Sequence, residues 1–573
     1  MIVHMRKIYI LIILACAAFS SVQSQLLEAT DKVWIFFNDK DTAGFNPNTF
    51  FDALAIERRM LNDLPLYDFT DVPVTPSYVK AVESITENNR AVSRWFNAMC
   101  CNATEAQQAQ LRQLSFVRDV KVVNHQLRLQ VAEFDRFDAH NPDADSYVPS
   151  ADEVLFLNAQ IERMGASVFA TKRIDGKGVR VAIFDVGFKS YNTNPAFEHI
   201  RKSNRIIKTY DFATNKEDVD HGGSHGTYVM SCVGGRIGKQ NIGLATGAEF
   251  LLARTERRTE YFSEEENWLE AAEWADQNGA HIINSSLGYT YHRYFKEDMD
   301  GQQSLVARAA NMAAKKGILV VNSAGNEGSG NWKSIGTPAD ADSVLSIGGI
   351  NPNTGVHTSF SSFGPTWDKR LKPNVTAYGH VIGSGPRGLD ETQGTSFSGP
   401  LVAGFAACAK QAAPTYKNMK LYGAIEKSSD LYPYFDYAHG YGVPQAKYFF
   451  KAPIPVEKQF SFERKNDRIY IRINDITSSN LSSLDSGASL IGQRYIAWPD
   501  YIFYHIENKK GYLDSYFVVN PYSKFSKTIE QMAGDGSKPL RGEGPLVVRK
   551  SEYAKPFTLR VYYRGYVDEI IIK

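Results

Sequence analysis

Cysteine, net charge and long hydrophobic runs are all scarce in this sequence, and each scarcity excludes a class of protein. Five cysteines in 573 residues cannot build a disulfide scaffold. The 64 basic and 63 acidic residues leave a formal charge of +1, without a run of like charges that would attract nucleic acid or an anionic membrane. Beyond the N-terminus no segment is apolar over the length that crosses a bilayer. We therefore expect no nucleic-acid partner.

The N-terminus is the exception to this polar character. Arg6 and Lys7 precede an apolar stretch from Ile8 to Phe19, and small polar residues follow from Ser20 to Ser24. A charged start, a short apolar run and a small-residue exit are typical of a secretory signal, and the run is too short to span a membrane permanently. We expect residues 1–24 to be a signal peptide and the protein to be secreted.

The cysteines fit an exported chain without disulfides. Cys16 lies in a sequence that matches a lipoprotein signal poorly, and we do not expect lipid anchoring there. Cys100 and Cys101 are adjacent and cannot close a useful loop with each other. Cys232 and Cys408 stand among small apolar residues, which indicates buried thiols.

The chain is long enough for about three domains, and the first has mixed character. Val33–Phe37 is an apolar strand, and Thr104 followed by Gln107 has the signature of a capping box that opens a helix through Leu114. Phe116–Val123 predicts a second strand. We expect residues 25–150 to hold an α+β module and its linker, because residues 125–155 are polar and turn-rich.

Residues 151–450 alternate apolar strands with helices, which is the pattern of a parallel sheet covered on both faces. The predicted strands are 179–184, which ends at Asp185, 281–283 and 318–321, and helices are expected at 268–275, as an amphipathic helix, and at 305–314. We predict an α/β, doubly wound, mostly parallel sheet. Ligands bind outside the carboxyl ends of the strands in such sheets.

Residues 451–573 lose the helical period. Ile469, Ile471 and Ile473 alternate with polar residues, and so do the apolar residues of 557–561, before a turn at Arg564-Gly565. This alternation predicts a separate, β-rich domain at the C-terminus.

A Gly-Thr-Ser turn at 394–396 leads into a segment that is apolar on every side, from Leu401 to Cys408. A helix without a polar face must be buried, and Pro400 suits the first turn of such a helix. Ser396 is then at or just before the helix N-terminus, where free N–H groups favour negative charge. Its hydroxyl is a candidate nucleophile, and the alternative is a serine that only caps a core helix.

A serine nucleophile needs a base, a carboxylate that orients the base and donors for the oxyanion. His225 begins a small-residue helix, Asp185 ends a strand, and Asn326 lies in a loop at another strand end. Singly, these could be a core histidine, a turn residue and a left-handed turn former. Together with Ser396 they favour one catalytic site.

The order Asp185, His225, Ser396 resembles that of the subtilisin-like serine proteases, the subtilase family. Five motifs carry the resemblance, spread over residues 176–446: Asp185-Val186-Gly187, His225-Gly226-Thr227, Asn284-Ser285-Ser286-Leu287-Gly288, Ala324-Gly325-Asn326 and Gly394-Thr395-Ser396.

The resemblance implies a secreted serine endopeptidase with polypeptide substrates. It makes Ser396 the nucleophile, His225 the base, Asp185 its orienter and Asn326 an oxyanion donor. Ser286, Leu287 and Gly288 would be an edge strand that pairs with substrate. The reaction would need no cofactor, although many relatives hold structural calcium.

The resemblance also implies how the protein is made. The N-terminal module resembles, more loosely, an inhibitory propeptide, and we expect self-cleavage within 125–155. The mature protein would be a monomer in the periplasm, in the medium or at the surface of a bacterial cell.

Three residues next to the expected site depart from the family pattern. Val186, Phe397 and Ser398 replace the usual Ser or Thr, Met and Ala. These replacements alter packing beside the site and remove no catalytic atom, so the shape of the pocket is what they change.

Other interpretations of the same residues carry less weight. Gly222–Gly226 matches a G-x-S-x-G elbow but lacks the strand that must precede it, and His221 with His225 lacks the pattern of a helical metal pair. A secreted binding or adhesion protein with a degenerate protease domain is the rival function. The C-terminal domain could stabilise the enzyme, bind substrate or surfaces, or direct sorting, and we favour a structural accessory.

Overall fold

The computed structural model describes residues 29–86, 89–123, 148–257, 263–291, 293–450, 456–474, 501–519, 528–533 and 546–573. These form two compact units, the first made of the described residues up to Ala43 and from Phe69 to 123, the second of Gly44–Asp68 and everything after the linker. The predicted signal peptide, Cys16 and the stretch 124–147 of the expected cleavage region lie outside the described residues.

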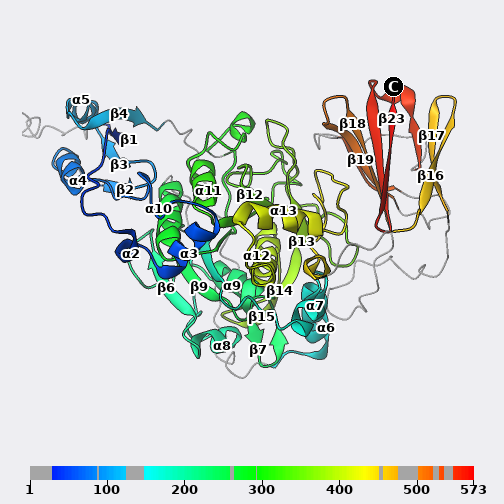
Figure 1. The fold of residues 1–573 in the computed structure, drawn as a ribbon, viewed down its shortest axis with the longest axis horizontal. Coiled ribbons are helices and arrows are strands. Elements are labelled where there is room, and N and C mark those ends of the chain that lie inside the picture. Colours follow the sequence, from blue (N-terminus) through cyan, green and yellow to red (C-terminus); the bar gives the residue numbers. More distant parts are fainter. Residues whose placement is uncertain are drawn as a thin grey trace, which may run out of the picture. The chain divides into compact units, whose positions relative to one another are not determined.

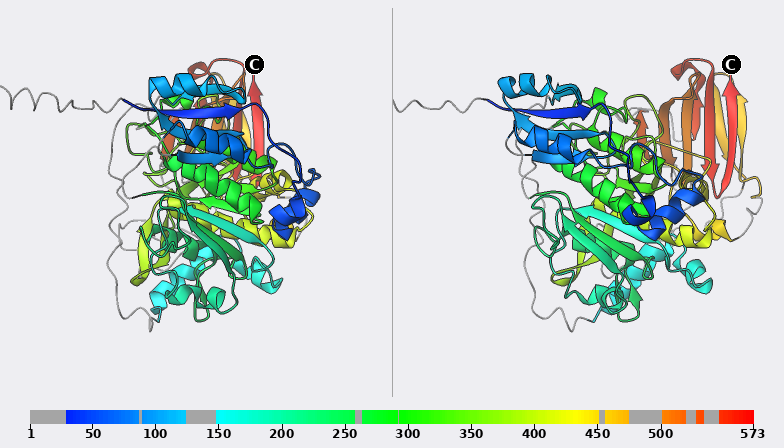
Figure 2. Two further views of the ribbon diagram at one scale, coloured as in Figure 1. Left: turned by 90° about the vertical axis from the view of Figure 1, so that its left-hand side faces the viewer. Right: turned by 60° about the vertical axis from the view of Figure 1, so that its left-hand side comes forward.

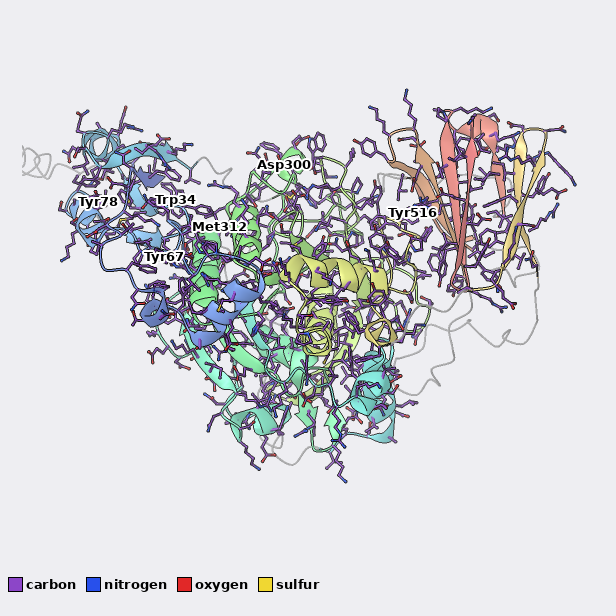
Figure 3. The ribbon with its side chains drawn as sticks, in the orientation of Figure 1. Trp34, Tyr67, Tyr78, Asp300, Met312 and Tyr516 are labelled. Atoms are coloured by element: carbon purple, nitrogen blue, oxygen red, sulfur yellow. The ribbon has the colours of Figure 1, made fainter. Side chains whose placement is uncertain are left out.

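The first unit is a four-stranded antiparallel sheet with the order β2-β3-β1-β4. Its elements follow a β-α-β-β-α-β sequence: β1 (Asp31–Phe37), α4 (Pro76–Glu83), β2 (Asn89–Ser93), β3 (Ala98–Ala103), α5 (Glu105–Leu111) and β4 (Val117–Val122). Val33, Ile35 and Phe37 alternate into the core, whereas Trp34, labelled in Figure 3, belongs to the other face of β1.

The capping box predicted at Thr104 and Gln107 is present at the start of α5. Thr104 donates its N–H to the Gln107 side chain at 2.9 Å, and the Gln107 N–H bonds the Thr104 hydroxyl at 3.3 Å. The expected end at Leu114 is wrong: α5 stops at Leu111, because the chain turns there to enter β4.

The second unit is built on a seven-stranded sheet in which every neighbouring pair is parallel, with the order β13-β12-β11-β10-β5-β9-β6 (Figure 1). The strands are β5 (Arg180–Asp185), β6 (Ile206–Asp211), β9 (Glu249–Arg254), β10 (Ile282–Ser285), β11 (Leu319–Ser323), β12 (Val344–Ile350) and β13 (Val375–Tyr378). The predicted doubly wound parallel sheet is confirmed.

Both faces of this sheet are covered by helices, because successive side chains of a strand point to opposite faces. Ile183 of β5 packs in the core that contains α9 (His225–Gly234) and α12 (Thr395–Ala412). The next residue, Phe184, meets Trp268 of α10 edge to face, with ring centroids 5.4 Å apart. α11 (Leu305–Lys315) packs beside α10.

The helix predicted at 268–275 is longer than expected and is not amphipathic. α10 spans Glu264–Gln277, and nearly all of it is buried, including its three first acidic residues. Arg293 makes an ion pair with Glu264 at 2.7 Å, and the Tyr294 hydroxyl donates to Glu265 at 2.6 Å. These bonds within the protein replace the contacts with water that an exposed polar face would make.

Shorter elements complete the second unit. These are α2 (Pro47–Phe50), α3 (Ala53–Leu61), α6 (Ala151–Glu162), α7 (Ala166–Thr171), α8 (Glu198–Arg201), β7 (Arg236–Ile237), β8 (Gln240–Asn241), β14 (His380–Gly385), β15 (Gly388–Gln393) and α13 (Asn418–Ser428). α6 begins after a Ser150–Glu153 capping box, so residues 151–155 are helical and not part of a turn-rich linker.

The C-terminal part is β-rich, as predicted. Its strands form a three-stranded and a five-stranded antiparallel sheet, which share one hydrophobic core. They are β16 (Phe460–Lys465), β17 (Arg468–Ile473), β18 (Ile502–Asn508), β19 (Leu513–Val519), β20 (Thr528–Ala533), β21 (Val547–Arg549), β22 (Phe557–Tyr563) and β23 (Tyr566–Ile572). Arg564 and Gly565 form the expected turn, both with positive φ. Tyr516 of β19 (Figure 3) packs with Phe363 and Ala438.

Two further features agree with the low cysteine content and the lack of long apolar runs in the sequence. Cys100, Cys101, Cys232 and Cys408 are all buried free thiols. No helix in the described ranges has the length and hydropathy needed to cross a bilayer.

Candidate active site

The strand order of the large sheet predicts a ligand crevice between β5 and β10. The chain leaves β5 toward β6, returns through β9, and then crosses to add β10 on the other side of β5. Such a reversal of strand order opens a crevice at the carboxyl ends of the two strands. Asp185 is the last residue of β5, and Ser286 directly follows β10.

Asp185 and His225 form a buried pair beside this crevice. His225 Nδ1 lies 2.9 and 3.0 Å from the two oxygens of the Asp185 carboxylate, and the carboxylate is fully buried. His225 is the first residue of α9, and Gly226 lets the helix approach β5 closely: a Cβ there would lie 2.5 Å from the Gly187 carbonyl oxygen. The pair fixes the ring so that Nε2 points away from Asp185.

Ser396 lies in the first turn of α12, as the sequence predicts. The helix begins at Thr395 after Gly394, and it has no side-chain cap, so Ser396 does not act as a capping residue. The ring of the adjacent Phe397 is 5.3 Å from that of His225, so the start of α12 lies near the Asp185–His225 pair.

Pro400 does not lie in the first turn of α12, contrary to the prediction from sequence, but inside the helix. A proline there removes the N–H that would bond the carbonyl four residues earlier, which is that of Ser396. The Ser286 hydroxyl donates to this carbonyl at 2.8 Å instead. In return the Ser396 hydroxyl donates to the Ser286 carbonyl at 3.3 Å, so the two serines are bonded in both directions.

Asn326 lies in the loop after β11 and is oriented by Thr395. Its Oδ1 accepts from both the N–H and the hydroxyl of Thr395, each at 2.9 Å. With its oxygen used in this way, the amide presents its Nδ2 donor near the start of α12, 3.4 Å from where a Cβ on Gly394 would lie. This role of Thr395 was not predicted from the sequence, although the residue directly precedes Ser396.

Ser286, Leu287 and Gly288 extend past the last paired residue of β10. The Leu287 carbonyl accepts from Asn322 Nδ2 at 2.9 Å. Gly288 is exposed, and its backbone has no hydrogen-bond partner within the described ranges. The three residues carry no strand pairing there, so their role as an edge strand stays a prediction.

The structure also shows the residues of the two weaker interpretations, the G-x-S-x-G elbow and the helical metal pair. No strand directly precedes Gly222, and His221 bonds the Asp218 carbonyl at 3.0 Å. Among the described residues no group of three or more His, Cys, Asp or Glu is placed to hold a metal ion. Structural calcium, which can use carbonyl ligands, stays a prediction.

A parallel α/β sheet with a serine, a histidine and a buried carboxylate at its carboxyl edge is typical of serine hydrolases. The family comparison narrows this class. Residues 176–442 match the model of the "Subtilase family", and residues 32–136 match the "Peptidase S8 propeptide domain, Bacteroidota". Residues 176–442 are therefore a subtilase-family domain and residues 32–136 a propeptide domain of this family, as the sequence predicts.

The chain is also similar to individual curated proteins and solved structures. Subtilisin Savinase from Lederbergia lenta is 28% identical over 272 residues, which is 47% of this chain and 90% of the relative. Alkaline elastase YaB from Bacillus sp. (strain YaB) is 27% identical over 272 residues, and the match spans 64% of that relative, a little under two thirds of its length. Among solved structures, MycP1 from Mycobacterium smegmatis is 23% identical over 52% of this chain and 85% of that one, with a TM-score of 0.41.

Proposed function

We propose that this protein is a secreted serine endopeptidase that hydrolyses peptide bonds through Asp185, His225 and Ser396. The observation that carries the proposal is the buried Asp185–His225 pair, which contacts the first turn of the helix that holds Ser396 through Phe397. The triad order and the subtilase match support it.

In the proposed reaction, the Ser396 hydroxyl turns from the Ser286 carbonyl toward His225 Nε2 when substrate binds. Ser396 Oγ attacks the scissile carbonyl carbon as its proton passes to His225, and Asp185 stabilises the imidazolium that forms. His225 then gives the proton to the leaving amine as the C–N bond breaks. A water molecule repeats the sequence on the acyl-enzyme and frees Ser396.

The oxyanion of the tetrahedral intermediate is assigned to two donors, Asn326 Nδ2 and the backbone N–H of Ser396. The first is oriented by its bonds to Thr395. The second belongs to the first turn of α12, whose N–H groups have no partner within the helix. Donors fixed in advance need no reorganisation as charge develops. Since side chains and one backbone N–H of the chain handle each proton and charge, the proposed reaction needs no cofactor.

Polypeptide substrate is proposed to pair with Ser286, Leu287 and Gly288. The exposed backbone of Gly288 supports this, because an extended peptide can bond to free N–H and C=O groups as an added strand. Sequence preference would come from the side chains that surround this strand.

We also propose that the protein is made as a monomeric zymogen, exported by residues 1–24, whose propeptide blocks the cleft until self-cleavage within 125–155. The propeptide match and the charged, apolar N-terminus support this. A Ser396→Ala protein should then be secreted with its propeptide still attached. A trimmed Ser396→Ala protein would assign the cut to another protease.

A fluorophosphonate probe tests the function directly, because it reacts only with an activated serine. The mature protein should be labelled at Ser396 and should cleave a peptide library, while a Ser396→Ala protein should do neither. A mature protein with an accessible cleft that stays unlabelled would favour the rival, a secreted binding protein with a degenerate protease domain.

A further inference from the structure

The segment Gly44–Asp68 belongs to the propeptide by sequence and to the peptidase unit by structure. The propeptide match spans residues 32–136, yet this segment packs in the second unit. It forms α2 and α3 and interrupts the first unit between β1 and α4. Both views of Figure 2 show these dark blue helices beside the yellow α13.

Two buried arginines of α3 share one buried carboxylate of α10. Arg58 and Arg59 are 2% and 1% exposed, and Asp276 is fully buried. An Arg58 nitrogen donates to one oxygen of Asp276, and Arg59 donates to the other at 3.0 Å. A carboxylate that accepts from two guanidiniums in this way is strongly bound to both.

Arg58 also donates to main-chain carbonyls at the C-terminal ends of two helices. It bonds the Lys316 carbonyl after α11 at 3.0 Å and the Asp276 carbonyl near the end of α10 at 3.2 Å. A third bond goes to the Ala280 carbonyl, just before β10. Helix C-termini carry unpaired carbonyls and partial negative charge, so a buried cation is well placed there.

Glycines at these two helix ends leave room for the segment. Gly279 and Gly317 have φ of +74° and +86°. A Cβ on Gly279 would lie 2.9 Å from Asp52 Oδ1, and one on Gly317 would lie 2.7 Å from Asn62 Nδ2. A side chain at either position would collide with α3 or its cap. The surface formed by these two helix ends therefore fits the segment closely.

Additional bonds surround the arginines. Gln277 accepts from the Asp52 N–H and donates to the Phe50 carbonyl, at 2.9 and 3.0 Å. Asn418 donates its N–H to Asn62 at 3.0 Å. The Asp63–Lys417 ion pair is exposed and contributes little. The buried arginines therefore dominate the attachment.

We propose that Gly44–Asp68 is an anchor that keeps the propeptide bound to the peptidase domain after the linker at 125–155 has been cut. It contacts the chain at the amino ends of β5, β10 and β11. This is the edge of the sheet opposite Ser396. This inference rests on the proposed function for the cut itself. It implies that linker cleavage alone does not release the propeptide, and that the anchor must be broken first.

The test uses a Ser396→Ala protein with a recognition site for an unrelated protease placed in 125–147. After the cut, the two fragments are diluted and their dissociation constant is measured by size-exclusion chromatography and light scattering. One variant carries Arg58→Ala and Arg59→Ala. A second replaces residues 44–68 by a Gly/Ser linker of the same length, and Lys417→Ala is the matched control for a lost surface pair.

The cut parent and the Lys417→Ala control should stay associated equally well. Both anchor variants should weaken association by at least about 100-fold, since they leave Asp276 buried without its partners or expose it. The proposal is overturned if the parent fragments separate as readily as the variants, or if the Gly/Ser variant stays bound as tightly as the parent.

Hydrogen exchange keeps the inference testable if a variant does not fold. In the cut parent, the backbone amides of α3 should stay as protected as in the uncut chain, and loss of that protection would contradict the anchor. None of these measurements needs catalysis. Failure of the anchor therefore leaves the probe-labelling result unaffected, and failure of labelling leaves the association result unaffected.

Discussion

The two edges of the seven-stranded sheet both bury charged side chains, but they use them differently. At the amino edge, the Asp276 carboxylate is bonded on both oxygens by Arg58 and Arg59. At the carboxyl edge, Asp185 bonds His225 through Nδ1 and leaves Nε2 directed elsewhere. A polar cluster whose bonding capacity is used within the chain fastens one part to another, whereas one with a group directed outward can act on a ligand.

The same contrast appears in the backbone. At the amino edge, Arg58 donates to main-chain carbonyls near the end of α10, after α11 and before β10. At the carboxyl edge, Gly394 offers no side-chain cap to the first turn of α12, whose Thr395 N–H donates to Asn326 Oδ1. We infer that the buried charged groups at the amino edge stabilise the fold, whereas those at the carboxyl edge take part in catalysis. Substitutions at the two edges should separate these roles.

The largest expected effect is at the carboxyl edge. Ser396→Ala removes the proposed nucleophile and should lower kcat on the order of 10⁶-fold, the loss known for the serine of subtilisin itself. Stability should hardly change, because the hydroxyl makes a single 3.3 Å bond. Steady-state assays with a peptide substrate measure the rate, and urea unfolding measures the stability. A variant with a rate within tenfold of the parent would assign the nucleophile elsewhere.

At the amino edge the order of effects should reverse. Asp276→Asn keeps the shape of the side chain but leaves two buried arginines without a counter-charge, which should cost about 3–5 kcal/mol of unfolding free energy. It is measured by urea unfolding of the uncut Ser396→Ala chain. The matched control, Asp63→Asn, removes an exposed pair and should cost less than about 1 kcal/mol. Equal losses in the two variants would contradict a dominant buried pair.

The functional residues at the carboxyl edge could be predicted from the sequence, whereas the buried ion pairs at the amino edge could not. Asp185, His225, Asn326 and Ser396 each stand in a short motif at a strand end or helix start, and parallel strands must bring such ends to one edge. Arg58 and Arg59 stand in a helical stretch without a recognisable motif, more than 200 residues before Asp276. Only tertiary packing brings them together, and no local pattern records that pairing.

Smaller errors have the same physical origin. An amphipathic helix with an exposed face was predicted at 268–275, but nearly all of α10 is buried, and Arg293 and Tyr294 bond its first acidic residues. Pro400 was expected in the first helical turn because proline favours that position. It lies deeper in α12 because Ser286 supplies the bond that proline removes. Local propensity predicts a structure only where no distant residue supplies the missing partner.

Asn326→Ala tests the oxyanion donor at the carboxyl edge. It should lower kcat about 10²- to 10³-fold with little change in KM, a magnitude known for the equivalent donor of subtilisin. Thr395→Val removes one of the two bonds that orient the Asn326 amide and should give a smaller loss of the same kind. Steady-state kinetics on one peptide substrate separate the two parameters. Full activity in Asn326→Ala would show that another group binds the oxyanion.

Ser286→Ala tests whether the two serines support each other. The Ser396 carbonyl, already without a helical partner because of Pro400, would lose its remaining hydrogen bond at a buried position. Leaving it unsatisfied should cost about 1–3 kcal/mol of unfolding free energy. Ser286→Thr keeps a hydroxyl and should recover most of the loss. If Ala and Thr variants unfold at the same urea concentration, the bond is not what stabilises this turn.

The smallest expected effect is the pH dependence of the unfolding free energy that comes from the histidine at the amino edge. His281, at the amino edge, accepts from the Arg180 N–H at 3.1 Å, and burial, with the nearby Arg58 charge, lowers its pKa to about 3. The unfolded chain binds a proton near pH 6.5 while the folded ring stays neutral, so the unfolding free energy should fall as the pH is lowered from 7 to 5. We expect about 1–2 kcal/mol from this residue, because the ring is only partly covered. His281→Asn keeps an acceptor but cannot be protonated, so the difference between its urea unfolding curves and those of the parent should vanish at pH 5 or reverse. An unchanged pH dependence would show that His281 is protonated equally in both states, and the amino edge would then have no part in the acid sensitivity of the fold.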